Sequence, residues 1–278
     1  MTTKITHQAQ NLYSLPLPLS WLQSIDFPHK LGICEYLFGT AIASRGICWV
    51  KTGAGIPWKL DLANSTHRWI VYGKYEGASF LNWAQKYLPA NAVIVDSGAN
   101  IGQMLMYLAQ WIPQGIILAF EPGREAADWL EECLTVHTNL PIEILRLGLG
   151  ACPSQLSLKS LGPNYIHGAW NQISDSDNEG EKIEIVRLVD VLVTRSIETV
   201  DLWKLDVEGF EIPALQGSEE LLKKQRIKAI YAELAGSNGQ RIRDYLSKFG
   251  YCCYLFDHNQ LYSPDQLPDH TNGLFLPC

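Results

Sequence analysis

Four acidic residues each stand at the end of an apolar run, and their types and spacing could do chemistry. They are Asp96, Glu121, Asp206 and Glu233. Short apolar runs rich in β-branched residues predict buried strands. Because the carboxyl ends of parallel strands lie along one rim of a sheet, we expect the four carboxylates to share that rim. There they could bind a polar ligand, accept a proton or hold a metal ion; the alternative is that they cap helices and bind loops.

A glycine-containing turn follows the first of these runs. The segment 92–96 ends at Asp96 and is followed by Gly98, Asn100 and Gly102, after which apolar residues recur with a helical period. This order predicts a strand, a tight turn and a helix. Gly98 has no Cβ, so the backbone there could approach a ligand closely. In an open α/β sheet, a nucleotide-like ligand binds at such a turn.

The residue types in this turn favour a cationic ligand. Dinucleotide-binding turns begin with a glycine where this chain has Asp96, and its carboxylate would repel a pyrophosphate. S-adenosylmethionine carries a sulfonium, an ammonium and a carboxylate but no phosphate, so it fits the turn better. Glu121, which follows the next apolar run at 116–120, is placed to accept hydrogen bonds from both ribose hydroxyls of such a ligand. The alternative is a glycine turn between packed elements, with two incidental acids.

Composition and charge argue against several other classes of protein. The chain has 278 residues, of which 47% are hydrophobic, and its net charge of -7 argues against nucleic-acid binding. No apolar run approaches the roughly 20 residues that cross a membrane, and the first residues do not have the order of a signal peptide. The seven cysteines include no C-x-x-C pair, so we expect reduced thiols, neither a zinc site nor a redox pair, and a cytoplasmic protein.

The elements that position the acids divide the chain into two domains. Residues 1–88 form an N-terminal extension, with two short strands around a glycine turn at 46–51 and 56–62 and a helix at 80–88. Its tryptophans are core residues, or they belong to a lid and line an acceptor pocket. Residues 89–278 alternate strand and helix, which predicts an α/β domain that binds the cofactor and carries out the chemistry.

We expect this domain to contain a mostly parallel sheet of about seven strands, with helices on both faces and right-handed crossovers. The strands are predicted at 92–96, 116–120, 142–147, 200–206, 227–234, 251–256 and 273–276. Two polar strands, 155–159 and 182–188, enclose a loop that we expect to be mobile. Ser218 is placed to cap a helix that runs to Lys224.

Several segments around the acids form an ordered set. They are Asp96-Ser-Gly-Ala-Asn-Ile-Gly102, Ala119-Phe-Glu-Pro122, Trp203-Lys-Leu-Asp-Val-Glu-Gly-Phe-Glu211 and Tyr231-Ala-Glu-Leu234, with Tyr72-Gly-Lys-Tyr-Glu76 before them and Asn272-Gly-Leu-Phe-Leu-Pro277 after them. The set resembles the signature blocks of FkbM-type S-adenosylmethionine-dependent methyltransferases from about residue 50 to the C-terminus. It departs from that family at Ser97 and at Arg187-Leu-Val-Asp190. The resemblance implies a class I methyltransferase (Rossmann-like) fold and methyl transfer, usually to an oxygen of a sugar or natural product.

The resemblance also implies roles for single residues. The implied cofactor contacts are Asp96, Gly98, Asn100, Gly102, Glu121, Pro122, Leu149 and Asp206, with Gly148 near the adenine. Glu121 would hold the ribose, and Asp206 would lie closest to the transferable methyl group. Glu76 and Glu233 would contact the acceptor.

Methyl transfer to an alcohol benefits from a general base that removes the hydroxyl proton. The candidate bases are Asp206, Glu208, His167 and His270. Lys204 is expected to be a structural ion-pair partner. The clustered acids could instead hold Mg²⁺, which would lower the pKa of an acceptor hydroxyl, although their spacing does not identify a metal site.

Two other functions stay open at this point. One is a nicotinamide-dependent oxidoreductase on a similar sheet, and Asp96 in place of the first glycine argues against it. The other is a non-catalytic interaction protein that keeps the fold, and the intact acids at the strand ends argue against that. We therefore expect a methyltransferase that uses S-adenosylmethionine and a small-molecule acceptor, with no nucleic-acid or membrane partner. The sequence does not specify the acceptor or the oligomeric state.

Overall fold

The computed structural model describes residues 12–23, 25, 27–52, 55–73, 78–159, 172–174, 180–257, 259–268 and 271–278. The predicted acceptor residue Glu76 and the candidate bases His167 and His270 lie outside these residues. So does most of the loop predicted to be mobile. The chain forms two compact units, residues 1–78 with 129–139 and residues 79–128 with 140–278. We call the first the N-terminal unit and the second the sheet unit.

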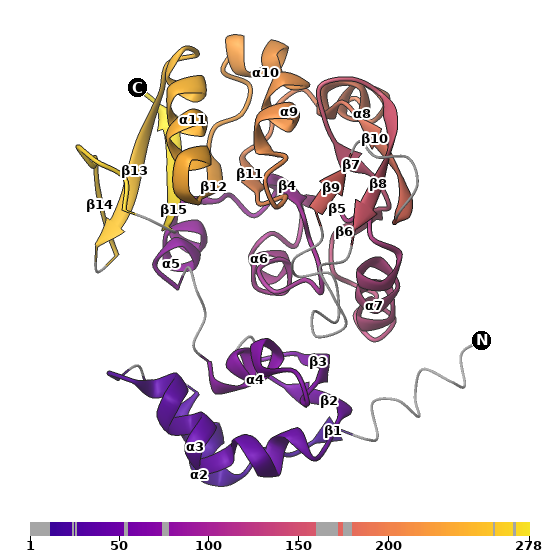
Figure 1. Ribbon diagram of the computed structural model, residues 1–278, viewed down its shortest axis with the longest axis vertical. Coiled ribbons are helices and arrows are strands. Elements are labelled where there is room, and N and C mark those ends of the chain that lie inside the picture. The colour runs from indigo at the N-terminus through magenta and orange to yellow at the C-terminus, as the bar shows by residue number, and fades with distance from the viewer. Residues whose placement is uncertain are drawn as a thin grey trace. The chain divides into compact units, whose positions relative to one another are not determined.

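The N-terminal unit contains a small sheet and three helices. Its described elements are β1 (Leu12–Tyr13), α2 (Leu17–Leu22), α3 (Lys30–Ala43), β2 (Ile47–Lys51), β3 (Pro57–Asp61) and α4 (Ser65–Tyr72) (Figure 1). β2 and β3 pair antiparallel, which confirms the predicted hairpin. The sequence did not predict α2 and α3, because neither helix begins with a side-chain cap.

The sheet unit alternates strands with helices. The helices are α5 (Ala78–Tyr87), α6 (Leu105–Trp111), α7 (Arg124–Leu134), α8 (Leu188–Thr194), α9 (Glu211–Gln216), α10 (Glu219–Lys223) and α11 (Gly236–Ser247), with α5 beginning and α7 ending in residues of the N-terminal unit. The strands are β4 (Val93–Ser97), β5 (Ile116–Phe120), β6 (Ile142–Leu145), β7 (Gly148–Leu149), β8 (Ser154–Lys159), β9 (Gln172–Ser174), β10 (Glu181–Val186), β11 (Leu202–Leu205), β12 (Ile230–Leu234), β13 (Tyr251–Asp257), β14 (Gln260–Tyr262) and β15 (Thr271–Pro277).

The main sheet of this unit has eight described strands, in the order β14-β13-β15-β12-β11-β4-β5-β6. β6, β5, β4, β11 and β12 run parallel, β15 runs the opposite way, and β13 and β14 form a hairpin at the edge. All seven predicted strands are present, and the eighth is β14, too short and polar to be recognised from sequence. The chain leaves β4 toward one edge and continues from β11 toward the other. A ligand binds at such a switch point, outside the carboxyl ends of the strands.

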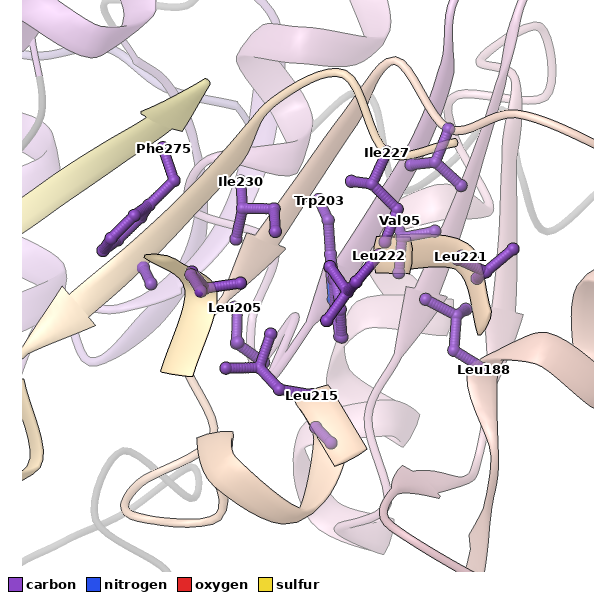
Figure 2. Packing of buried hydrophobic residues seen from close by; sticks show 14 of the residues in the cluster. Val95, Leu188, Trp203, Leu205, Leu215, Leu221, Leu222, Ile227, Ile230 and Phe275 are labelled. Atoms are coloured by element: carbon purple, nitrogen blue, oxygen red, sulfur yellow. The ribbon is translucent and has the colours of Figure 1, made fainter. Parts of the chain in front are cut away.

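Helices cover both faces of the main sheet, as predicted. In Figure 1, α8 to α11 lie on one side of the strands, and α5 and α6 lie on the other. The buried core on the α8 to α11 side includes Val95, Trp203, Leu205, Leu215, Leu222 and Ile230 (Figure 2). Because side chains alternate between the faces of a strand, Asp96, Lys204 and Tyr231 face α5 and α6. Phe80 of α5 stacks on Tyr231 with ring centroids 3.7 Å apart.

Outside the main sheet, the structure agrees with the sequence in part. A second sheet, β7-β10-β8-β9, contains the two predicted polar strands. Its strand β10 is shorter than predicted, because the β-branched run from Leu188 to Thr194 is helical. Ser218 does precede α10, but its hydroxyl donates to the carbonyl of Ala214 at 3.0 Å and does not cap the helix. In the described part of the chain, no helix has the length and apolarity to cross a membrane.

A disulfide contradicts the prediction that all thiols are reduced. Cys252 of β13 is bonded to Cys278, with their Cα atoms 5.4 Å apart. The pairing of β13 with β15 places Cys252 opposite Leu276, so a cysteine two residues beyond Leu276 comes within bonding reach. The two cysteines are 26 residues apart in sequence, and without the strand register nothing in the sequence pairs them.

Candidate functional site

The register of the main sheet brings Asp96 and Lys204 together at the switch point. Asp96 of β4 lies opposite Lys204 of β11, which in turn lies opposite Tyr231 of β12. Ser97 and Leu205, the last residues of β4 and β11, are also opposite each other. The turns that follow the two strands therefore start side by side on the same rim. This is the rim on which the sequence places the four acids.

Lys204 forms the centre of this region. Its Nζ donates to the carbonyl of Gly98 at 2.8 Å and lies 3.4 Å from Oδ1 of Asp96 and 3.2 Å from Oδ2 of Asp206. Burial raises the pKa of Asp96, and the nearby ammonium opposes that rise. For Lys204, burial lowers the pKa, but the two carboxylates outweigh burial and the pKa is raised overall. The expected structural ion-pair role of Lys204 is confirmed.

The structure gives a steric reason for Gly98 that the sequence did not suggest. Gly98 has a φ of 73°, and a Cβ at this position would lie 1.9 Å from the carbonyl oxygen of Asp206. Close approach of the neighbouring turn therefore requires a glycine before any ligand is considered. The amides of Gly98 and Ala99 both donate to the carbonyl of Phe120, at 3.0 and 3.1 Å. Asn100, with a φ of 49°, also has the left-handed conformation that asparagine tolerates.

Glu121 ties the glycine turn to the loop after β5. Its Oε2 accepts from the amide of Asn100 at 2.8 Å, and its Oε1 accepts from the amide of Gly123 at 2.9 Å. Burial raises the pKa of this carboxyl to about 7, although both amides and Lys204 oppose the rise. Each carboxylate oxygen has a second lone pair, so the predicted ribose contact is compatible with these bonds.

The turn after β11 is organised by a residue to which the sequence reasoning assigned no role. Oε1 of Glu211 accepts from the amides of Val207 and Gly209, both at 3.1 Å, and its Oε2 accepts from Nδ2 of Asn238 at 2.6 Å. Glu211 is only 1% exposed. The signal that could have revealed it is an acid in the first helical turn after a glycine-containing loop.

Glu208 lies within this second turn, in a left-handed conformation with a φ of 51°. Burial raises its pKa to about 7, and the negative charges of Asp206, Glu233 and Glu211 add to the rise. The structure thus brings two candidate bases, Asp206 and Glu208, and the predicted acceptor residue Glu233 into one electrostatic neighbourhood. A carboxyl with a pKa near 7 suits proton transfer at neutral pH.

The predicted adenine contacts lie beside the loop after β5. A Cβ at Gly148 would lie 3.8 Å from Cγ of Pro122, which places β7 next to that loop. The side chain of Leu149 is 2% exposed and belongs to the core on the α8 to α11 side. The side chain of Leu149 therefore packs in the core, and only its backbone could contact a ligand.

Comparison with known proteins connects this site to one family. Residues 96–253 match the family model described as the methyltransferase FkbM domain. The matched segment begins at Asp96, includes both turns and extends beyond β12. The chain belongs to the FkbM methyltransferase domain family.

Two curated proteins are similar in sequence to this chain over about half of its length. The methyltransferase sdnD of Sordaria araneosa is 32% identical over 162 residues, which cover 48% of this chain and 62% of the relative. The 31-O-demethyl-FK506 methyltransferase FkbM of Streptomyces tacrolimicus is 28% identical over 174 residues, covering 53% of this chain and 66% of the relative. The chain thus spans less than two thirds of the length of either. A solved human structure, methyltransferase 10 domain containing protein, has 9% identity and a TM-score of 0.48, covering 89% of this chain and 97% of that one.

Two buried side-chain oxygen atoms at the end of β4 and in the glycine turn after it have no hydrogen-bond partner in the structure. They are Oδ1 of Asp96 and Oδ1 of Asn100. The first is at ion-pair distance from Lys204 but does not have hydrogen-bond geometry. Buried acceptors without donors are costly, so both atoms fit a ligand that brings N–H or O–H donors. Among the described residues, no three histidine, cysteine, aspartate or glutamate side chains are grouped to hold a metal ion.

Proposed function

We propose that this chain is an S-adenosylmethionine-dependent methyltransferase that methylates a hydroxyl oxygen of a small molecule, a sugar or natural product. The observation that carries the proposal is a pair of buried acceptor atoms without hydrogen bonds at the switch point of the sheet, Oδ1 of Asp96 near the end of β4 and Oδ1 of Asn100 in the glycine turn. The ammonium of S-adenosylmethionine would supply donors to such acceptors. The same acidic rim disfavours phosphorylated cofactors such as NAD.

The cofactor contacts follow from this placement. Asp96, Gly98, Asn100 and Gly102 would hold the methionine end, and Glu121 would accept from the ribose hydroxyls. Pro122 would turn the chain beneath the ribose, and the backbone of Gly148 and Leu149 would border the adenine. The cofactor supplies an electrophilic methyl group, and the protein fixes it in line with the acceptor oxygen. Such positioning can lower a barrier by roughly 7–11 kcal/mol where the geometry is ideal.

The acceptor hydroxyl must lose its proton during transfer. The two carboxylates of the turn after β11 are the candidates to accept this proton. Glu208, with a pKa raised to about 7, suits the role of base, whereas Asp206 is held by Lys204 and suits orientation of the acceptor and balance of the cofactor charge. With the cofactor bound, the acceptor oxygen would take its methyl group, and the carboxylate would accept the hydroxyl proton. Glu233 would contact the acceptor from β12.

The class of acceptor is inferred from the relatives and from charge. One relative is named as a methyltransferase of 31-O-demethyl-FK506, a name that denotes a methylated oxygen of a natural product. The net charge of -7 favours such an acceptor over nucleic acid. We propose that the N-terminal unit helps to bind it, with Glu76 as one contact. A cytoplasmic location is also a proposal, and the Cys252–Cys278 disulfide is the observation that opposes it.

Calorimetry with S-adenosylmethionine, S-adenosylhomocysteine and NADH tests the proposal. We expect the first two to bind and NADH not to bind. The variant Asn100→Gly keeps the left-handed backbone but removes the buried Oδ1, so S-adenosylhomocysteine should bind about tenfold more weakly, or about 1.4 kcal/mol.

The matched control is Asn259→Gly, the same substitution at another left-handed asparagine with a φ of 67°, at the β13–β14 turn. It should bind the ligand as the wild type does. Absence of binding of both adenosyl ligands to the wild type would refute the proposed function. Equal affinity of the two variants would instead remove Asn100 from the cofactor site.

A further inference from the structure

The ammonium of Lys204 has partners in three separate places. They are the carbonyl of Gly98 in the turn after β4, Oδ1 of Asp96 within β4, and Oδ2 of Asp206 after β11. The contact with Gly98 is a hydrogen bond, and the contacts with the two carboxylates are ion pairs. One side chain therefore links both turns of the switch point.

Charge neutralisation alone does not explain this arrangement. Asp96 is 1% exposed and needs a cation beside it, but the side chain of Asp206 is 39% exposed and has water to solvate it. The ion pair with Lys204 places the partly exposed Asp206 carboxylate beside an ammonium that also binds the glycine turn.

The balance of charge supports a ligand-directed purpose. When ionised, Asp96, Lys204 and Asp206 together carry one net negative charge, and among the described residues the acidic Glu121 and Glu208 also interact electrostatically with Lys204. The region thus retains a negative potential toward a cation even though a lysine lies within it. A sulfonium placed between the two turns would meet a favourable field.

We propose that Lys204 is a positioning residue of the methyltransferase site. It holds the Asp206 carboxylate against the glycine turn, so that the cofactor side and the acceptor side keep one geometry. The inference rests on the proposed function for its ligand, and it assigns to Lys204 a role beyond neutralising Asp96.

The chain contains another lysine–aspartate ion pair at the opposite rim of the sheet. Lys228, just before β12, lies 2.7 Å from Oδ1 of Asp201, whose Oδ2 accepts from the amide of Val93 at 2.8 Å. The ion pair joins β12 to β11 at the amino ends of the strands, and Asp201 in turn binds β4; unlike Lys204, Lys228 has an exposed side chain. Lys228→Met therefore removes a cross-strand lysine without touching the site.

The test separates positioning from neutralisation. Lys204→Met alone would leave Asp96 charged and buried, so it is combined with Asp96→Asn, and the double variant is compared with Asp96→Asn alone. We expect the double variant to bind S-adenosylhomocysteine and S-adenosylmethionine at least tenfold more weakly than Asp96→Asn. Adding Asp206→Asn should then change affinity less than twofold, because residues that act through one another are not additive.

Amide hydrogen exchange gives a readout that needs no cofactor. The turns at 97–102 and 206–210 should exchange faster in the double variant than in Asp96→Asn, whereas Lys228→Met should change neither these turns nor the affinity. Lys204→Arg, which keeps the charge, is the second variant in case the double variant does not fold. Its planar fork cannot meet the same three acceptors, so affinity should again fall at least tenfold.

The two hypotheses fail in different ways. A wild type that binds neither adenosyl ligand refutes the proposed function. A wild type that binds them, together with a double variant or Lys204→Arg variant that binds within threefold of its reference, overturns the role of Lys204 and leaves it a neutralising residue. Unchanged exchange in both turns of a folded Lys204 variant overturns it as well.

Discussion

Replacement of Gly98 by alanine tests whether this glycine serves the sheet or the ligand. The added Cβ would lie 1.9 Å from the carbonyl oxygen of Asp206, far inside van der Waals contact. The obstacle is backbone, so it moves only if the end of β11 moves. Such overpacking typically costs about 1–3 kcal/mol, and the left-handed φ adds roughly 1–2 kcal/mol for any residue with a Cβ. We expect Gly98→Ala to lose about 2–5 kcal/mol of unfolding free energy.

Gly209→Ala is the control. Gly209 also has a positive φ, of 94°, but a Cβ added there would meet no atom within 4 Å apart from its own residue and its chain neighbours. It should therefore show only the conformational cost of about 1–2 kcal/mol. Urea unfolding of both variants, without ligand, gives the two losses and their difference. If Gly98→Ala is no less stable than Gly209→Ala but loses affinity for S-adenosylhomocysteine, then the glycine serves the ligand and the steric reasoning is wrong.

Two further predictions concern the carboxylates of the site. Because burial raises the pKa of Glu121 from 4.5 to about 7, the folded state holds this proton more tightly than the unfolded state, and stability is lost as the pH rises from about 4.5 through about 7, with no further loss once the group is ionised in both states. Glu121→Gln should remove about 3 kcal/mol of that loss, seen as a flatter dependence of melting temperature between pH 5 and 8; an unchanged dependence would show that Glu121 is ionised throughout. Asp206→Asn should keep cofactor affinity within about tenfold but lower turnover by at least about 10², in an assay with the true acceptor. Wild-type turnover in that variant would make Asp206 a structural residue.

The sequence predicted the main sheet well because its strands carry a strong local signal. Runs such as 92–96 and 116–120 are apolar throughout, as expected of strands covered on both faces, and all seven runs form strands of one sheet. Once the strands are known to be parallel neighbours, the acids at their carboxyl ends must lie along the same rim. The elements that escaped prediction have weak or misleading local signals: β14 has three residues, and α8 is rich in the β-branched residues that favour strands.

The positions of the acidic residues at the switch point could be predicted from the sequence, but their contacts could not. Sequence spacing identified Asp96, Glu121 and Asp206, but the partners of each depend on strand register and on backbone conformation across the switch point. Gly98 must be a glycine because the carbonyl oxygen of Asp206, more than one hundred residues away in sequence, lies beside it. Lys204 likewise binds the carbonyl of Gly98, which is more than one hundred residues before it. The Cys252–Cys278 bond depends on pairing of β13 with β15 in the same way. Local patterns carry no information about such contacts.

The two turns of the switch point are built in the same way. Each has residues with left-handed backbone, Gly98, Asn100 and Gly102 in one and Glu208 and Gly209 in the other. Each is held by the carboxylate of a buried glutamate that accepts two backbone amides, Glu121 for the first turn and the loop beside it, and Glu211 for the second. Left-handed residues are costly and persist only where their surroundings hold them, and here the holding groups are carboxyl oxygens that accept hydrogen bonds from backbone amides. Because these glutamates bind backbone amides, the conformations of both turns are set by the protein itself, without a ligand.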